Sequence, residues 1–500
     1  YDGIDFVPTN KFVLLGHHFS SIAGAGPIVG PILAGVAFGW LPAILWIVLG
    51  TIFIGGLHDF SSLVISVRHE GRSIAEIVNK YVSKTAYKLF LIFIWLALMY
   101  VVAVFTDLAA ESFAKEPSVA QISILYVIIA IFFGLLVYKI KISLSLSTVV
   151  ALGLILIGIF LNLYYEFLFF EKQVWVWILL SYAFCASILP VWFLLQPRDY
   201  LSSYFLYFTV IVGLIGLIFG KHIVSSPAFV SFNSKDLGPL VPFIFITIAC
   251  GAVSGFHSLV SSGTTSKQLD DIRNAKFVAY GGMILEGIVA TVALSTLMIF
   301  PKGVNIANPQ QVYATGIGKF CMLLGISENV GRTIGYLAIS AFILTTLDTA
   351  TRISRYIFQE FAGVRQASLV KRVVATIISL ILPVLLLNLK LRDASGNVTS
   401  CWRIIWPLFG TTNQLLAALV LLTVYVWIKK QNSRSVINIF LPTLFMLFVT
   451  LFALIRITYA KVINRQFDIV TISAMCLLAL AIYVVVECSK TVLRQRSFSS

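Results

Sequence analysis

Apolar runs about as long as a membrane is thick recur throughout this chain and limit its possible folds more than any other feature. A helix needs about 20 apolar residues to cross the hydrocarbon core of a bilayer, and the sequence contains fourteen runs near this length. They cover residues 16–38, 41–67, 89–111, 120–138, 146–165, 174–195, 202–220, 240–262, 277–300, 334–350, 373–387, 406–428, 436–455 and 469–488. The chain is therefore predicted to be an all-α membrane protein with about 14 transmembrane helices.

The composition agrees with a lipid environment. Only 11% of the 500 residues are charged, whereas a soluble domain carries about 25%. This composition argues against a soluble enzyme. The net charge of +15 would suggest a nucleic-acid partner in a soluble protein, but basic loops on one side of a membrane explain it, so we expect no nucleic acid among the partners.

The basic residues also predict an orientation. When the fourteen runs are threaded alternately across the bilayer, 23 of the 36 Lys and Arg residues fall on one side. Cytoplasmic loops carry such an excess. The sequence therefore predicts a multi-pass membrane protein with the N-terminus and the basic loops in the cytoplasm.

The first apolar run contains the clearest departure from helical sequence. Two prolines and four glycines occur within residues 16–31, and a proline inside a helix removes a hydrogen bond and clashes with the preceding turn. We predict a break at residues 24–27, where freed carbonyl groups could hold a cation and a half-helix N-terminus could face an anion. The alternative is an unbroken, glycine-rich helix packed closely on its neighbours.

Polar side chains gather in the eighth run. Three serines come after His257, namely Ser258, Ser261 and Ser262. Counted from Ser258, they stand at i, i+3 and i+4, which places the three hydroxyl groups on one helix face. Oxygen ligands of this kind suit a small cation. The alternative is that the hydroxyls bond carbonyls of their own helix.

Ionisable residues at membrane depth are costly and indicate function by default. His58 and Asp59 lie in the second run and Glu286 in the ninth. We expect all three to take part in ion or proton coupling. Asp348 is expected to pair with Arg352 at i+4.

Two further pairs of polar residues lie within the apolar runs: Asp107 with Glu111, and Asn413 with Gln414. Glu111 is near the outer end of its run and could reach the lipid headgroups. For Asn413 and Gln414 we favour contacts between helices over a place on the transport path.

Histidines near the irregular runs suit proton transfer or contact with an anionic substrate, because histidine titrates near neutral pH. His17 and His18 precede the predicted break, and His257 lies in the eighth run. No H-x-x-x-H or H-x-x-E spacing occurs, so we expect no metal site. Pro190 predicts a further break in the sixth run, where Gln196 could contact substrate.

The cysteines give little information. The six Cys residues are scattered singly and form no C-x-x-C pair. Cys321 and Cys401 fall in loops placed outside and could form a disulfide. Buried cysteines otherwise behave as small apolar residues.

Five sequence motifs together resemble the carbon starvation protein A family. They are Val-Pro-Thr-Asn-Lys at 7–11, Gly-His-His-Phe at 16–19, Ala-Gly-Ala-Gly-Pro at 23–27, Gly-Ala-Val-Ser-Gly-Phe-His at 251–257 and Trp-Pro-Leu-Phe-Gly-x-x-Asn-Gln at 406–414. The resemblance implies an inner-membrane carrier of peptides or pyruvate, used under carbon starvation. It also implies the amino acid–polyamine–organocation superfamily and its leucine-transporter-like core of five plus five inverted helices.

The resemblance also implies an arrangement within the chain. Residues 1–15 would be a cytoplasmic segment, with a further helix upstream. Residues 16–360 would form the transporter core with discontinuous helices, and residues 361–500 additional transmembrane helices and a basic cytoplasmic tail. The run that contains Pro190, five after the first, would be its inverted counterpart, and the eighth run would pack beside the first. No intramembrane Lys lies near residues 24–27 or 258–262 to replace a sodium ion.

We therefore expect a secondary active transporter that works by alternating access. The predicted substrate contacts are His17, His18, Gly24, Ala25, Gly26, His257 and Gln196. The predicted ion or proton residues are Ser258, Ser261, Ser262, Asp59, His58 and Glu286. The coupling ion would be H+ or Na+, with no other cofactor, and the partners would be a small solute and the lipid bilayer. A channel, a membrane nutrient sensor and an intramembrane enzyme with convergent metal ligands are the alternatives, and the sequence does not fix the oligomeric state.

Overall fold

The computed structural model describes residues 8–162, 164–165, 167–190, 193–300, 308–364, 368–389, 398–431, 436–463 and 469–496. The α-helices are α1 (Lys11–Ile22), α2 (Gly26–Phe38), α3 (Trp40–Gly50), α4 (Gly56–Val67), α5 (Ile74–Tyr81), α6 (Lys84–Lys115), α7 (Pro117–Gly134), α8 (Leu144–Asn162), α9 (Lys172–Ile188), α10 (Leu195–Phe219), α11 (Leu240–Thr247), α12 (Phe256–Val260), α13 (Ser266–Gln268), α14 (Gly281–Met298), α15 (Pro309–Cys321), α16 (Glu328–Phe361), α17 (Leu369–Asn388), α18 (Cys401–Lys430), α19 (Val436–Ile463) and α20 (Ile469–Arg496).

Short elements interrupt or extend these helices. The π-helices are η1 (Thr51–Gly55), η2 (Leu135–Ile140), η3 (Ser261–Thr265) and η5 (Lys276–Tyr280), and the 3-10 helices are η4 (Ile272–Asn274) and η6 (Met322–Leu324). Strands β1 (Asn233–Ser234) and β2 (Gly238–Pro239) form a small antiparallel hairpin before α11. The all-α class is therefore confirmed, since the strands are confined to this hairpin in the described part of the chain.

The membrane spans agree with the apolar runs, although the predicted count of fourteen is not confirmed. Among the described residues, eleven continuous helical segments are long and apolar enough to cross a membrane, and the bent pair α1–α2 makes up to twelve. The sixth run folds as α9, which is a shorter apolar helix. The eighth run folds as two separate helices, α11 and α12.

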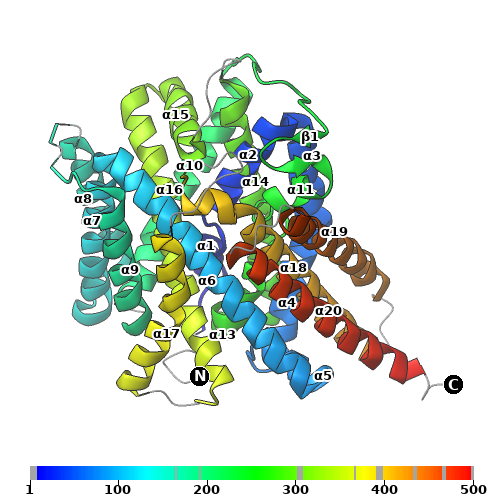
Figure 1. The fold of residues 1–500 in the computed structure, drawn as a ribbon. Helices are drawn as coiled ribbons and strands as arrows, with labels where there is room; N and C mark the ends of the chain where they lie inside the picture. The colour runs from blue at the N-terminus through cyan, green and yellow to red at the C-terminus, as the bar shows by residue number, and fades with distance from the viewer. Residues whose placement is uncertain are drawn as a thin grey trace.

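The long helices form a bundle around a buried centre (Figure 1). Most of the apolar stretch of α6, α16 and α18 is buried, against only a third of that of α8, α17, α19 and α20. The helices α7 and α8 lie at one edge of the bundle and α19 and α20 at the opposite edge, with α1 between them (Figure 1). The exposed apolar faces of the outer helices suit contact with lipid.

Serine side chains fix where several of these helices begin. Ser73, Ser83 and Ser327 stand directly before α5, α6 and α16, and each accepts a hydrogen bond from a backbone N–H of the first turn. This N-capping satisfies donors that would otherwise lack a partner. The helices α2 and α12, which begin at the candidate site, have no such side-chain cap.

Candidate functional site

Two interrupted helices meet at the centre of the bundle. The first run breaks as predicted, because α1 ends at Ile22, α2 begins at Gly26, and the two helices are bent by 48°. The eighth run is interrupted between α11 and α12, a break that the sequence analysis did not predict. A Cβ atom on Gly26 would lie 2.5 Å from Sγ of Cys250. Glycine is therefore required for the close contact between the two breaks.

The break after α1 leaves polar backbone inside the protein. Among the described residues, no hydrogen bond reaches the carbonyl oxygens of Ala23 and Gly24. A Cβ on Gly24 would lie 2.6 Å from Oγ1 of Thr346, a buried hydroxyl that also has no partner in the described part of the chain. Unsatisfied polar groups are costly in a membrane interior. Ala25 is fully buried between Gly24 and Gly26.

Side chains from neighbouring helices hold the second break in shape. Trp46 Nε1 donates to the carbonyl of Ile248 at 3.1 Å, and Thr51 Oγ1 donates to that of Gly251 at 3.1 Å. Asn413 on α18 accepts at Oδ1 from the N–H of Phe256 at 2.9 Å and at its carbonyl from Gly255 at 3.1 Å. The prediction that Asn413 makes contacts between helices is confirmed.

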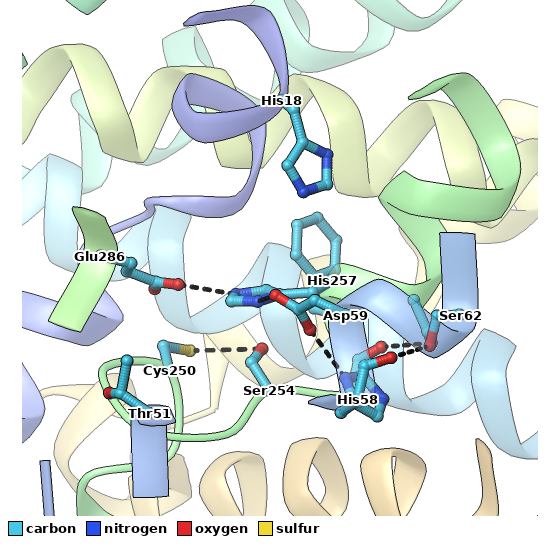
Figure 2. Close-up of polar contacts among 12 residues, drawn as sticks. His18, Thr51, His58, Asp59, Ser62, Cys250, Ser254, His257 and Glu286 are labelled. Carbon is cyan, nitrogen blue, oxygen red and sulfur yellow. Dashed lines mark hydrogen bonds and ion pairs between the residues drawn. The ribbon is translucent and has the colours of Figure 1, made fainter. Parts of the chain in front are cut away.

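Beside these breaks, one imidazole lies between two carboxylates. Nδ1 of His257, from α12, is 2.7 Å from Oδ2 of Asp59 on α4, and Nε2 is 3.0 Å from Oε2 of Glu286 on α14. His58 Nδ1 is 2.7 Å from Oδ1 of Asp59. All four side chains are fully buried, and Figure 2 shows that they converge from three elements.

The two contacts of His257 differ in kind. The contact with Asp59 has hydrogen-bond geometry, whereas the close approach to Glu286 does not, and both oxygens of Glu286 lack a hydrogen bond in the described structure. Removing a charge from water is costly unless it is paired. Glu286 therefore either holds a proton or balances a positive charge on His257, so the group can store and release a proton.

His18 reaches the same region from α1 (Figure 2). Its Nδ1 is 2.9 Å from Oγ1 of Thr265, and its buried Nε2 has no partner among the described residues. His17 is only partly buried, and its Nε2 lies 3.5 Å from Nε2 of Gln268. The two neighbouring histidines thus have different surroundings.

Most of the serine hydroxyls expected to hold an ion form hydrogen bonds within their own helix. Ser258 Oγ donates to the carbonyl of Gly255 at 2.6 Å, and Ser262 Oγ donates to that of Ser258 at 2.8 Å. Ser261 Oγ is buried without a partner in the described part of the chain. For two of the three serines, the alternative of bonds within the helix is the observed one.

The break predicted at Pro190 is present, since α9 ends at Ile188 and α10 begins at Leu195. Gln196 lies in the first turn of α10, but its side chain is outside the described part of the structure. The element whose break meets that of the first run is α11–α12 rather than this segment. The predicted inverted repeat with the Pro190 run is therefore not confirmed.

A second buried network lies around Arg198, in the first turn of α10. Its guanidinium contacts both Asp348 on α16 and Asp199, the latter at 2.8 Å, and all three side chains are buried. Tyr182 Oη donates to Asp348 Oδ2 at 2.8 Å. The predicted pairing of Asp348 with Arg352 is wrong. A long-range contact overrides the i+4 spacing because α10 brings Arg198 against α16.

Arg352 instead donates to backbone carbonyls of Ala186 and Leu189, the second at 2.6 Å. Glu111, for which contact with lipid headgroups was considered, has partners within the protein. Its carboxylate accepts hydrogen bonds from Trp402 Nε1 at 2.7 Å and from Ser400 at 2.7 Å. These contacts connect α6 with the start of α18.

Cys321 and Cys401 are both free, so the disulfide considered for them is absent.

Cys250, Ser254 and Thr51 at the second break were missed as site residues. For Cys250 and Ser254, the run of small residues from 250 to 255 was the available signal.

No group of three His, Cys, Asp or Glu side chains within the described residues is placed to hold a metal ion. In the Asp59–His257–Glu286 group the imidazole ring separates the two carboxylates. This geometry suits a proton between the groups.

Comparison with known proteins gives consistent matches. A family model described as "Carbon starvation protein CstA" matches residues 1–309 and 302–453. "Peptide transporter CstA" of Escherichia coli (strain K12) is 33% identical, over 90% of this chain and 74% of that protein. "Pyruvate/proton symporter BtsT" of the same strain is 32% identical, over 91% of this chain and 75% of that protein.

Solved structures include a similar fold. A crystal structure of a mutant manganese transporter of Eremococcus coleocola aligns with a TM-score of 0.53 and 13% identity, over 98% of this chain and 99% of that one. At this identity the match shows a shared arrangement of helices and nothing about the transported solute.

Proposed function

Because the chain belongs to the carbon starvation protein CstA family, we propose that this multi-pass membrane transporter imports small carboxylate-bearing nutrients by proton-coupled symport. The substrate is a short peptide or pyruvate, taken up under carbon starvation across the bacterial inner membrane. The N-terminus and the basic loops are cytoplasmic, residues 16–360 form the core, and transport proceeds by alternating access. The names of the E. coli relatives, a peptide transporter and a pyruvate/proton symporter, support this class of solute.

One observation favours a proton over sodium as the coupling ion. His257 lies within 2.7 Å of Asp59 and 3.0 Å of Glu286, and all three groups are buried. Buried carboxylate and imidazole groups in contact exchange protons when their surroundings change. A sodium site would need several converging oxygen ligands, whereas the hydroxyls of Ser258 and Ser262 are directed to carbonyls of their own helix.

The substrate carboxylate is assigned to the break at Gly24, Ala25 and Gly26. The N-terminus of α2 begins there, and a helix N-terminus attracts an anion. His18 brings a ring nitrogen that has no partner among the described residues. The charge of the bound carboxylate would then act on His257. His17 and Gln196 would contact the remainder of the solute.

The coupling follows from these positions. When a carboxylate binds beside His18 and His257, the added negative charge favours a bound proton on the His257–Glu286 pair. Release of the solute removes that charge and favours release of the proton. Binding energy is thereby shared between solute and proton, as linkage requires.

Uptake by proteoliposomes tests the proposal. Labelled pyruvate and a labelled dipeptide would each be offered with an imposed proton gradient, with a sodium gradient, and with neither. Accumulation that follows the proton gradient is expected for at least one solute. Accumulation driven by sodium alone would overturn the proton assignment. Absence of uptake under every condition would favour a sensor, and rapid equilibration without accumulation would favour a channel.

A further inference from the structure

An apolar cavity lies between the end of α16 and the start of α17. Its volume is about 210 Å³, and its lining residues are Phe358, Gln359, Ala362, Val364, Val370, Lys371, Val374 and Ala375. Two thirds of the apolar stretch of α17 is not buried inside the protein, so the cavity is at the lipid-facing side of the bundle. Apart from Gln359 and Lys371, the lining side chains are hydrocarbon.

Beside the cavity is the buried positive charge of Arg355, which lies over the ring of Tyr356 at 4.6 Å but has no acidic partner among the described residues. Arg355 precedes Phe358, Gln359 and Ala362 by three, four and seven residues, so it lies on the same face of α16. Its side chain is only 2% exposed, and its Nε and Nη1 atoms have no hydrogen-bond partner among the described residues. A buried, unpaired charge costs several kcal/mol.

More basic groups surround the same position. Arg352 and Arg372 are close enough to repel the Arg355 guanidinium, and Lys371 lines the cavity. Arg352, Arg355 and Lys371 form no ion pair with an acidic residue in the described parts of the chain. The nearby carboxylate of Glu360 is already bonded to Tyr87 at 2.9 Å.

We infer that the α16–α17 cavity is a binding site for an anionic phospholipid. The phosphate is bound by Arg355 and Lys371, and one acyl chain occupies the apolar cavity. Arginine binds phosphate through paired N–H donors, and basic pockets between transmembrane helices bind anionic headgroups. An anion of this class supplies the partner that Arg355 lacks, and its hydrocarbon chain fills space that water would not stabilise.

The site is separate from the transport pathway proposed above, but α16 connects the two regions. Asp348, seven residues before Arg355, belongs to the Arg198 network. Bound lipid would therefore stabilise the C-terminal end of α16, the helix that carries Asp348.

Thermal unfolding of the full-length chain in detergent provides the test. We would titrate phosphatidylglycerol, phosphatidylcholine and inorganic phosphate separately and measure the midpoint of unfolding. Phosphatidylglycerol is expected to raise the midpoint, and the other two are expected to leave it unchanged. An equal rise with phosphatidylcholine would overturn the proposal, and so would an equal rise with phosphate, which would indicate a site for free anions.

Variants connect the effect to the site. Arg355→Gln should weaken the apparent affinity for phosphatidylglycerol by about tenfold or more, and Arg355→Lys, which keeps the charge but loses the paired donors, should weaken it less. Lys371→Gln provides a second variant if Arg355→Gln does not fold. Lys88→Gln is the matched control, since Lys88 is an exposed residue of α6 outside the cavity. Unchanged lipid affinity in both Arg355→Gln and Lys371→Gln would refute the assignment.

Discussion

Two buried charged networks in the described part of the chain differ in their chemical composition. One places His257 between Asp59 and Glu286, so every member can gain or lose a proton. The other is organised by Arg198 between Asp199 and Asp348, and an arginine stays charged at any physiological pH. Both are fully buried, so depth in the membrane does not by itself distinguish a coupling site from a structural one.

The difference suggests two roles. The guanidinium of Arg198 keeps its positive charge, and the contacts of this network connect α9, α10 and α16. The charge of the His257 network can change by a proton at the point where the two broken helices meet. We therefore expect the first to affect mainly stability and the second mainly coupling, and each prediction below tests this distinction.

The largest effect is expected from Arg198→Met. Removing the arginine leaves the carboxylates of Asp199 and Asp348 buried without a cation, which costs about 3–5 kcal/mol in the free energy of unfolding. Chemical denaturation in detergent measures this loss. A triple variant that adds Asp199→Asn and Asp348→Asn should regain most of it. If the single variant is as stable as the parent protein, the structural role is wrong.

Glu286→Gln should separate coupling from stability. The amide keeps the shape but cannot release a proton, so proton-driven accumulation should fall by about 5–150-fold, the range of a coupling free energy of about 1–3 kcal/mol. Exchange of labelled for unlabelled solute without a gradient should persist. Undiminished proton-driven accumulation in this variant would remove Glu286 from the mechanism.

Gly26→Ala tests the contact between the two breaks. The new Cβ would lie 2.5 Å from Cys250, and overpacking of this kind costs about 1–3 kcal/mol. Adding Cys250→Gly should restore both stability and uptake, which a double-mutant cycle would measure. Independent, additive effects would show that the two breaks do not depend on this contact.

The smallest effect is expected from Ser262→Ala. Its hydroxyl bonds a carbonyl of its own helix, so the change in stability should stay within about 0.5 kcal/mol, and uptake should keep its dependence on the proton gradient. Ser261→Ala is the matched comparison, because that hydroxyl has no partner among the described residues. A loss of uptake in Ser262→Ala would bring the sodium hypothesis forward.

Local sequence patterns predicted much of this structure. Apolar length located the helices, and the glycines and prolines of residues 16–31 located the first break. The cost of burying charge drew attention to Asp59 and Glu286, which both contact His257 in the structure. These inferences depend on short-range chemistry that each segment carries by itself.

Predictions failed where distant segments decide the outcome. Asp348 pairs with Arg198, 150 residues earlier, and not with Arg352 on its own helix. The break before α12 is stabilised by Trp46, Thr51 and Asn413, which come from three other segments. Spacing along one helix contains no information about such partners, since they depend on how the helices pack.

The attachment of α12 to Asn413 has a consequence for the rate of the transport cycle. Asn413 is hydrogen-bonded to each of residues 254–256: its carbonyl accepts from Gly255 at 3.1 Å, its Oδ1 accepts from Phe256 at 2.9 Å, and its Nδ2 donates to Ser254 at 3.0 Å. At about 1 kcal/mol each, breaking them together would slow a step by about a hundredfold. We expect α12 and α18 to rotate as one rigid piece, so that the distance between spectroscopic labels on them stays constant while the protein turns over. The speed of turnover then depends on how easily α18, a long and almost fully buried helix, slides past α6.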